Sequence, residues 1–350
     1  YARLYLYDLI ENIHYQFPVI VGLHVDDVAT IAHGNIDDCF TVITEVSKLL
    51  FNNLEERKLK ISPKTVILSS KPNAAKTMAT KLATEGIRCK VESHVRDLGI
   101  DAGGGGRRAT TVFRARAAKA KKRMVQLKKL KRIDRRAKCL YRTNIWPTTS
   151  FAVGANGVAP TSVKKMRSNA AAAALGKFGQ CTTTAIALMF PPGTDPAVKV
   201  RLEVIKQWIQ LWLKADDDTK ANVKRLWQKQ LPKMKGDKRW SFVNGPMRAT
   251  IASLYDLKWI PVQADCWLEP LPSDRMWQIT GPGDLRTFCE TINQKQYHKL
   301  WDEASERFDG EGLQDGVDLK IVKKHLRHFE QNGMPDRYAA LATVACGAAW

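Results

Sequence analysis

The chain has 350 residues, 44% of them hydrophobic and 26% charged, which is typical of a globular protein large enough for two or three domains. Its 56 lysines and arginines outnumber its 35 acidic residues. The resulting net charge of +21 indicates a polyanionic partner, most often nucleic acid, although an anionic membrane surface would suit the same balance. No apolar stretch approaches the roughly 20 residues that cross a bilayer, which excludes a membrane-spanning helix within this sequence.

The seven cysteines are spread along the chain, and no two have the Cys-x-x-Cys spacing of a zinc or redox motif. Their odd number and wide separation predict free thiols and an intracellular, reducing compartment. The sequence begins at Tyr1 without a signal peptide and stops after Trp350 without a polar tail. We therefore expect it to be a piece of a longer polypeptide.

An early apolar stretch is interrupted by two adjacent aspartates, Asp26 and Asp27. Runs rich in valine and isoleucine lie on either side, bounded by Pro18 and Gly34, and predict two strands joined in a hairpin with both carboxylates at its tip. Carboxylates fixed on a rigid turn are ligands that magnesium takes in phosphate chemistry. Because aspartate is also common in plain turns, a structural turn is the alternative for the pair alone.

The segments around this hairpin predict a small layered domain over residues 1–102. Helical patterns cover residues 1–16, 36–54 and 73–85, and the second begins after a capping asparagine, Asn35. Residues 59–70 predict a turn followed by a strand, and further strands are predicted at 87–91 and within 95–101. This alternation of strands and helices predicts helices packed against a sheet.

Four glycines at 103–106 predict a flexible joint, and the chemistry of the chain changes after them. Residues 107–142 contain sixteen lysines and arginines and a single acid, Asp134. Apolar residues recur there at helical spacing, so we predict a packed helical element whose outer side is basic and contacts phosphates. The basic residues expected to contact nucleic acid are Arg107, Arg108, Arg114, Lys121, Lys122, Arg123, Lys128, Lys129 and Arg132.

The rest of the chain predicts a basic helical domain over 107–180 and a helical, tryptophan-rich region over 196–350. Nine of the ten tryptophans follow position 200. Core packing is the predicted role of most of them, and some could stack on bases. His325 and His328 share a helix face without a third metal ligand in view, and they are interpreted as surface residues.

The order of these features resembles the second half of the palm, followed by the thumb, of a reverse transcriptase of the non-LTR retrotransposon type, over about residues 1–180. Three motifs carry the resemblance. His24-Val25-Asp26-Asp27 is similar to the Tyr/Phe-x-Asp-Asp box, and Leu59–Thr65 is similar to the lysine motif that follows it. Arg96-Asp97-Leu98-Gly99 is similar to the Leu-Gly turn that grips the primer end.

The resemblance implies an α+β fold: a partial palm with an antiparallel sheet and packed helices, followed by an α-helical thumb and an α-helical C-terminal region. It implies that Asp26 and Asp27 bind metal, with two Mg²⁺ ions activating the primer hydroxyl and stabilising the leaving pyrophosphate. Lys64 matches the lysine that protonates pyrophosphate, and a solvated turn lysine is the equal alternative. His24, Leu98 and Gly99 would contact nucleic acid at the primer end.

The implied partners are an RNA template, a DNA primer and deoxynucleoside triphosphates, and the implied location is nuclear. Two departures matter. His24 stands where the family has an aromatic residue, and Asp8 lies too close to Asp26 to be the further catalytic aspartate of an upstream strand. We therefore expect a retroelement RNA-directed DNA polymerase whose 350 residues here are inactive alone.

The alternative is a non-catalytic, basic nucleic-acid-binding remnant in which the aspartates form a plain turn. A membrane-bound scaffold is disfavoured, because the basic helical face carries alanines instead of the large apolar wedge of interfacial helices. The sequence identifies no protein partner.

Overall fold

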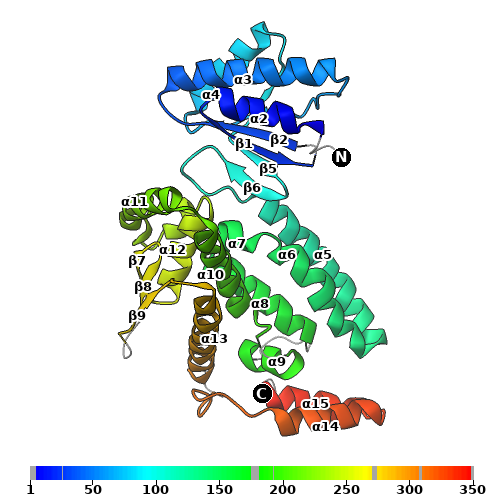
Figure 1. Ribbon diagram of the computed structural model, residues 1–350. Coiled ribbons are helices and arrows are strands. Elements are labelled where there is room, and N and C mark those ends of the chain that lie inside the picture. The colour runs from blue at the N-terminus through cyan, green and yellow to red at the C-terminus, as the bar shows by residue number, and fades with distance from the viewer. Residues whose placement is uncertain are drawn as a thin grey trace. The chain divides into compact units, whose positions relative to one another are not determined.

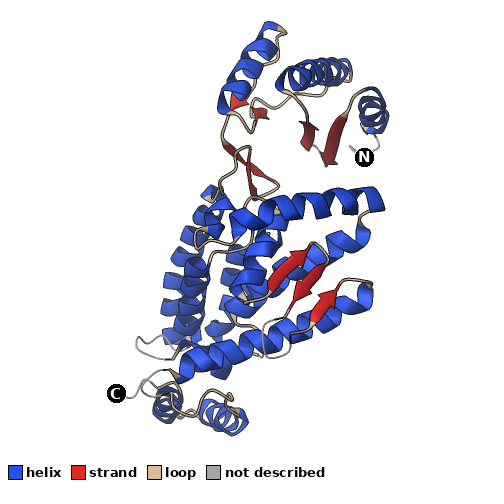
Figure 2. Ribbon diagram, turned by 90° about the vertical axis from the view of Figure 1, so that its left-hand side faces the viewer, coloured by secondary structure: helices blue, strands red, loops and turns tan. Residues whose placement is uncertain are grey.

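The computed structural model describes residues 5–25, 27–174, 181–191, 193–269, 274–306 and 310–347. These residues are mostly helical, with small separate sheets (Figures 1 and 2). The chain forms two compact units, residues 1–96 with 102–106 and residues 97–101 with 107–350. The glycine joint predicted at 103–106 lies at this boundary. The two regions predicted as separate domains, 107–180 and 196–350, belong to one unit.

In the first unit, two helices cover one face of a β-hairpin (Figure 1). The elements are α2 (Tyr7–Gln16), β1 (Val19–His24), β2 (Asp27–Ala32) and α3 (Ile36–Glu56). Leu9, Ile13, Val19 and Val46 form the buried centre between helices and hairpin. The side chain of Asn35 caps α3 by accepting hydrogen bonds from the amides of its first turn, as its position in the sequence predicted.

The remaining elements of this unit are short. β3 (Val66–Ile67) and β4 (Lys90–Val91) pair in parallel around α4 (Pro72–Thr84). Met78, Leu82 and Ile87 are buried there. A third pair of strands, β5 (His94–Asp97) and β6 (Ile100–Gly103), forms where the chain passes between the units, and residues 97–101 at its tip belong to the second unit.

The strands of residues 5–106 do not join in the single antiparallel sheet implied by the palm resemblance. In the described part of the chain they make three separate two-stranded sheets, β1–β2, β3–β4 and β5–β6. One reason is length: β3 and β4 contribute two residues each, too few to extend a ladder across neighbouring strands. The coarse expectation of mixed α and β structure holds, with helices predominating.

The second unit begins with the basic segment, which is helical as predicted. Its first elements are α5 (Thr111–Ile133), the 3₁₀ turn η1 (Arg135–Cys139), the π turn η2 (Tyr141–Ile145), α6 (Trp146–Ser150), α7 (Val153–Asn156), α8 (Pro160–Ala174) and α9 (Thr182–Met189). Met124 and Leu127 of α5 pack against alanines of α8 in a core that also receives Leu326 from the C-terminal helices. One face of α5 is therefore fixed to the unit.

A second core lies among the tryptophan-bearing elements. These are α10 (Pro196–Lys214), α11 (Asp217–Met234), η3 (Arg239–Phe242), α12 (Pro246–Asp256), β7 (Ile260–Gln263), β8 (Cys266–Leu268), β9 (Met276–Gln278) and α13 (Pro282–Ser305). Figure 2 shows the antiparallel β7–β8–β9 sheet among the helices. Every tryptophan between positions 200 and 347 is buried, at 9% exposure or less, so these rings pack the interior and do not form a base-stacking surface.

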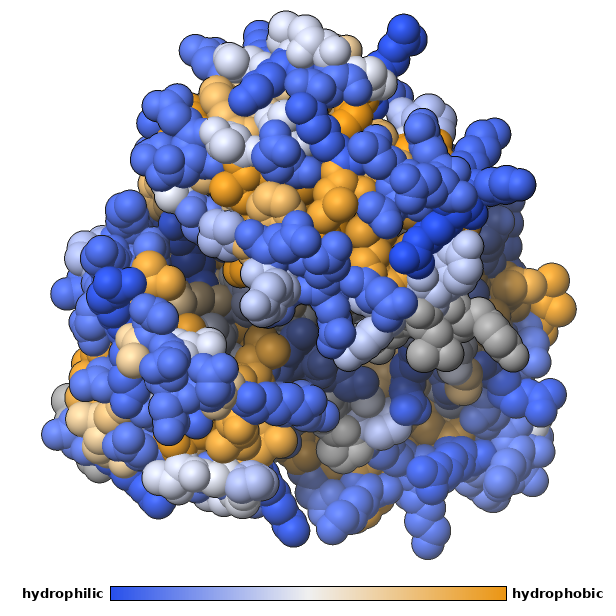
Figure 3. All heavy atoms as spheres, turned by 45° about the horizontal axis from the view of Figure 1, so that its top comes forward, coloured by the Kyte–Doolittle hydropathy of each residue, from blue (hydrophilic) through white to orange (hydrophobic). Residues whose placement is uncertain are grey.

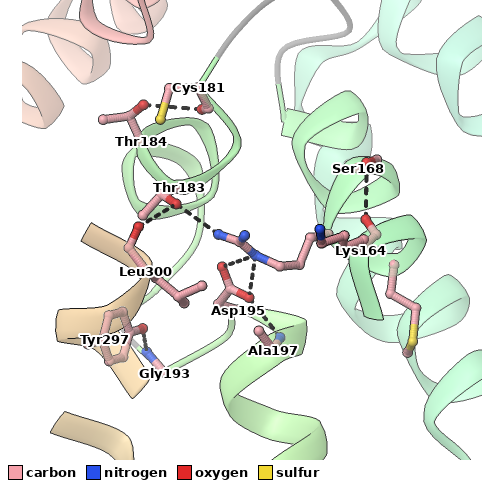
Figure 4. Close-up of polar contacts among 12 residues, drawn as sticks. Lys164, Ser168, Cys181, Thr183, Thr184, Gly193, Asp195, Ala197, Tyr297 and Leu300 are labelled. Atoms are coloured by element: carbon pink, nitrogen blue, oxygen red, sulfur yellow. Dashed lines mark hydrogen bonds and ion pairs between the residues drawn. The ribbon is translucent and has the colours of Figure 1, made fainter. Parts of the chain in front are cut away.

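A buried ion pair joins several helices of this unit (Figure 4). Arg167 of α8 donates from Nε to both carboxylate oxygens of Asp195 at 3.0 Å and from Nη2 to Oγ1 of Thr183 at 2.8 Å. Thr183 donates in turn to the Leu300 carbonyl of α13. Asp195 also caps α10 by accepting from the Ala197 amide. The hydrogen bonds of Arg167, Thr183 and Asp195 together therefore join α8, α9, α10 and α13.

The described chain ends in a helix pair, α14 (Lys320–Gln331) and α15 (Pro335–Ala345). All seven cysteines are free thiols. No helix in the described ranges combines the length and apolar character required to cross a membrane.

Candidate functional site

The predicted hairpin forms, and it places Asp27 at the first position of β2 directly opposite His24. Val25 and Asp26 separate them in the sequence, and Asp26, the other predicted metal ligand, lies outside the described residues. Asp27 and His24 are both exposed. Val25 is 64% exposed with φ of 59°, a conformation that strains a β-branched side chain. Such strain at a turn is characteristic of functional loops.

His24 and Asp27 lie on the face of the hairpin that α2 and α3 leave uncovered. Burial alternates along both strands, so Ile20, Gly22, Ala29 and Ile31 share this face. Ile20 and Ile31 are paired across the strands and are 57% and 49% exposed. Figure 3 shows apolar side chains interspersed among hydrophilic ones on the face that it presents. On the uncovered face of the hairpin, the residues before the tip are therefore small or apolar, and His24 and Asp27 lie at the tip.

Lys64, the other predicted catalytic residue, is exposed in a turn where its amide donates to Oγ of Ser62 at 3.2 Å. Within the described residues, no hydrogen bond or ion pair joins Lys64 to Asp27. Nor does any group of three or more histidine, cysteine and carboxylate side chains gather there. Asp27 therefore contributes one carboxylate, and the described residues do not form a complete magnesium site.

Leu98 and Gly99 form the two-residue turn between β5 and β6, with φ of 43° and 80°. Positive φ at both positions is the signature of a type I′ hairpin turn, in which asparagine and glycine are favoured. Leu98 is 47% exposed despite this strain. Gly99 lies against α5, because a Cβ placed there would come within 2.7 Å of Nη2 of Arg116 and 3.2 Å of the Phe151 ring.

The N-terminus of α5 is fixed by the next residues of the same hairpin. Asp101 accepts hydrogen bonds from the amides of Val112 and Phe113 at 2.8 and 3.0 Å. The Asn156 side chain donates to the Asp101 carbonyl at 2.8 Å and accepts from the Gly245 amide at 2.9 Å. The carboxylate of Asp101 thus lies at the first turn of α5, where the helix has unpaired amides and the positive end of its dipole.

The outer half of α5 is densely basic. Seven lysines and arginines of the helix are exposed, and the helix contains no acidic residue. Arg114, Lys121 and Lys128 are seven residues apart, as are Lys122 and Lys129, so the exposed cations cluster along one side of the helix. The exposed basic residues are Arg114, Lys119, Lys121, Lys122, Lys128, Lys129 and Arg132.

Two of the predicted nucleic-acid contacts are instead used inside the unit. Arg108 donates to the carbonyls of Asn156 and Gly157 and stacks on the Trp240 ring, and burial lowers its pKa to about 10. Arg123 donates to the Asn144 carbonyl at 3.3 Å and to Thr148. Arg107 is exposed ahead of the helix.

Sequence reasoning missed three residues that build this surface. Lys119 is exposed among the basic residues and belongs with them. Lys131 turns inward and donates to the carbonyls of Ala173 and Ala174 at the end of α8, and burial lowers its pKa to about 8. The capping role of Asp101 could not be predicted from the sequence, because the amides that it caps lie eleven and twelve residues away, beyond the range of local capping signals.

Comparison with known proteins gave no match: no family model, no curated protein and no solved structure matches this chain. The site must therefore be interpreted from its own residues.

Proposed function

We propose that this chain binds nucleic acid through the exposed basic half of α5 and belongs to an RNA-directed DNA polymerase of a retroelement. The observation that carries the proposal is the row of exposed cations on a helix that is anchored at both ends. Arg114 and Arg132 are 18 residues apart, so the row extends for about 27 Å at 1.5 Å per residue. Cations spaced along such a rigid rod displace counterions from a phosphate backbone and bind it without reading sequence.

The β1–β2 hairpin supports the polymerase part of the proposal. It presents Asp27 and His24 beside the strained, exposed Val25, and the other residues of its uncovered face have small or apolar side chains. The order of this hairpin, the Lys64 turn, the Leu98-Gly99 turn and the basic helix is that of the palm and thumb in the reverse transcriptase resemblance. In this proposal the partners are an RNA template, a DNA primer and deoxynucleoside triphosphates.

The described residues do not by themselves support magnesium chemistry, because Asp27 is their one carboxylate at the hairpin and no cluster of ligands surrounds it. A polymerase site would need Asp26 and a further carboxylate from another strand. The second candidate function is a non-catalytic nucleic-acid-binding protein, which requires only the exposed cations of α5. The two candidates share the role of α5 and differ only in catalysis.

Nucleic-acid binding is tested with the triple variant R114Q/K121Q/R132Q, which removes three exposed charges from one side of α5. The probe is a fluorescent 20-base-pair RNA–DNA duplex, titrated at several salt concentrations. We expect the dissociation constant to rise at least about tenfold and the log–log salt slope to become shallower by about two to three, since each lost phosphate contact removes about 0.9. The control is R225Q/K229Q/K233Q on α11, which removes the same charge from exposed positions. Equal binding by the wild type and the α5 variant would refute the proposal.

The polymerase part is tested on the coding sequence and the full-length polypeptide. We expect codons upstream of Tyr1 to encode a strand with a Phe-x-x-x-Asp pattern. We also expect Asp26→Asn and Asp27→Asn to abolish primer extension by the full-length protein while leaving duplex affinity unchanged. Primer extension that survives both substitutions would leave the non-catalytic alternative.

A further inference from the structure

The penultimate helix, α14, carries a second strongly charged surface. Its twelve residues include Lys320, Lys323, Lys324 and Arg327 but a single acid, Glu330. The helix is the most clearly two-sided of the second unit: Leu326 is buried, and Val322 and Phe329 pack against the same core as α5 and α8. The apolar side is thus already covered, and the basic side faces solvent.

The one acid of α14 does not offset this charge on the exposed side. Glu330 is half-buried and lies 3.9 Å from Nζ of Lys138 in η1, the turn that follows α5. The ion pair shows that Glu330 faces the end of the basic segment and not the exposed side of α14. Among the described residues, no acidic side chain forms an ion pair with a lysine or arginine of α14. The exposed charged residues within α14 are therefore all basic, and the nearest exposed acid in sequence, Asp318, precedes the helix and accepts from the Lys320 amide at 2.9 Å.

Three of the cations point the same way. Lys320, Lys324 and Arg327 are exposed and follow the i, i+4, i+7 spacing that aligns side chains on one side of a helix. Lys323 is half-buried and so belongs to the inner side. Together with the exposed Lys320, it borders a cavity of about 230 Å³ between α9, α13 and α14. His325 and His328 are exposed on the flank of this row.

From this arrangement we propose that α14 is a second contact for the phosphate backbone of nucleic acid, separate from the α5 surface. The inference rests on the proposed function in taking nucleic acid as the partner. A membrane surface suits α14 less well, because an interfacial helix needs its apolar side free to enter lipid. Here that side packs in the core, and Ile321, at 70% exposure, is the one large apolar residue of α14 that is left exposed.

The test compares K320Q/K324Q/R327Q with wild type and with the α11 control R225Q/K229Q/K233Q, using the same RNA–DNA duplex. We expect the α14 variant to bind at least about fivefold more weakly, with a salt slope shallower by about two, while the control stays within about twofold of wild type. The charge-preserving variant K320R/K324R/R327K should retain wild-type affinity. Unfolding in urea checks that every variant is folded.

Each other outcome decides the matter. Unchanged duplex binding by the α14 variant overturns the inference, as does an equal loss in the α11 control, which would mean that net charge alone determines affinity. Binding to phosphatidylserine vesicles that falls in the α14 variant while duplex binding stays constant would assign the surface to membranes and overturn it too. If the α5 variant binds normally and the α14 variant does not, the α5 interface fails and the role of α14 stands.

Discussion

The carboxylate of Asp101 accepts hydrogen bonds from the amides of Val112 and Phe113 and so joins the β5–β6 hairpin to the first turn of α5. Asp101 is 9% exposed, so water does not replace these bonds readily. The direction of the basic helix therefore depends on a residue that precedes the glycine joint in sequence. Both sides of this contact belong to the second unit.

Removal of this cap should destabilise the second unit. We expect Asp101→Ala to lower its free energy of unfolding by about 1–3 kcal/mol, because helix-terminal amides lose a charged acceptor in a buried place. Urea unfolding followed by tryptophan fluorescence reports on this unit, which contains every tryptophan of the chain. The exposed neighbour Asp97 provides the control, and Asp97→Ala should change stability by less than about 0.5 kcal/mol. Equal effects of the two substitutions would contradict the capping role.

Gly99 cannot carry a side chain without cost. Its φ of 80° disfavours other residues, and a Cβ would press on Arg116 and the Phe151 ring. We expect Gly99→Ala to cost about 1–2 kcal/mol of unfolding free energy, from backbone strain and displacement of these side chains. Gly236→Ala is the control, since no atom lies within 4 Å of that Cβ position and its φ is not positive. If Gly99→Ala leaves the unfolding free energy unchanged, the turn accommodates a side chain without strain.

Val25 is a place where local preference and structure conflict. Asparagine tolerates positive φ far better than a β-branched residue, so Val25→Asn should stabilise the first unit by about 0.5–1 kcal/mol. Circular dichroism during thermal unfolding measures the change, and Val19→Asn, at a buried strand position, should destabilise instead. If the strain serves polymerisation, Val25→Asn will also lower primer extension by the full-length protein. If Val25→Asn is less stable than wild type, the positive φ of Val25 does not strain the first unit.

Lys131 makes stability depend on pH in the alkaline range. Its folded-state pKa of about 8 lies below the ordinary value of 10.5, because burial and the neighbouring Lys138 and Lys128 disfavour the charged form. The folded state thus binds this proton more weakly than the unfolded state does. The stabilising contribution of Lys131 is therefore complete above about pH 10.5 and is lost as the pH falls through about 8.

The measurement is the difference in unfolding free energy between wild type and Lys131→Met at pH 7, 8, 9 and 10. The unfolding free energy of wild type should rise relative to that of Lys131→Met as the pH rises. A difference that stays constant across this range would rule out the lowered pKa of Lys131. Lys121→Met, at an exposed position of the same helix, is the control for removing a lysine without removing a buried one. Lys131 also donates hydrogen bonds to the carbonyls at the end of α8. Lys131→Met should therefore be less stable than wild type at every pH above 9.

The sequence by itself determined the local elements and the sign of the surface. The apolar runs on either side of the two aspartates specified the hairpin, and Asn35 specified the start of α3. The periodicity of residues 111–133 specified a helix with a basic outer side. These features depend on neighbours within a few residues, which is the range over which side-chain pattern and capping act. The burial of the tryptophans followed from their size and apolar character.

Only the tertiary structure decided which cations face outward and which strands pair. Arg108, Arg123 and Lys131 are the same residue types as their exposed neighbours. They point into the unit because they donate hydrogen bonds to backbone carbonyls of segments that are distant in sequence. The expected single sheet became three pairs of strands because β-pairing depends on partners far apart in sequence. The union of the basic segment with the C-terminal helices has the same origin, since Leu127 and Leu326 meet in one core across about 200 residues of chain.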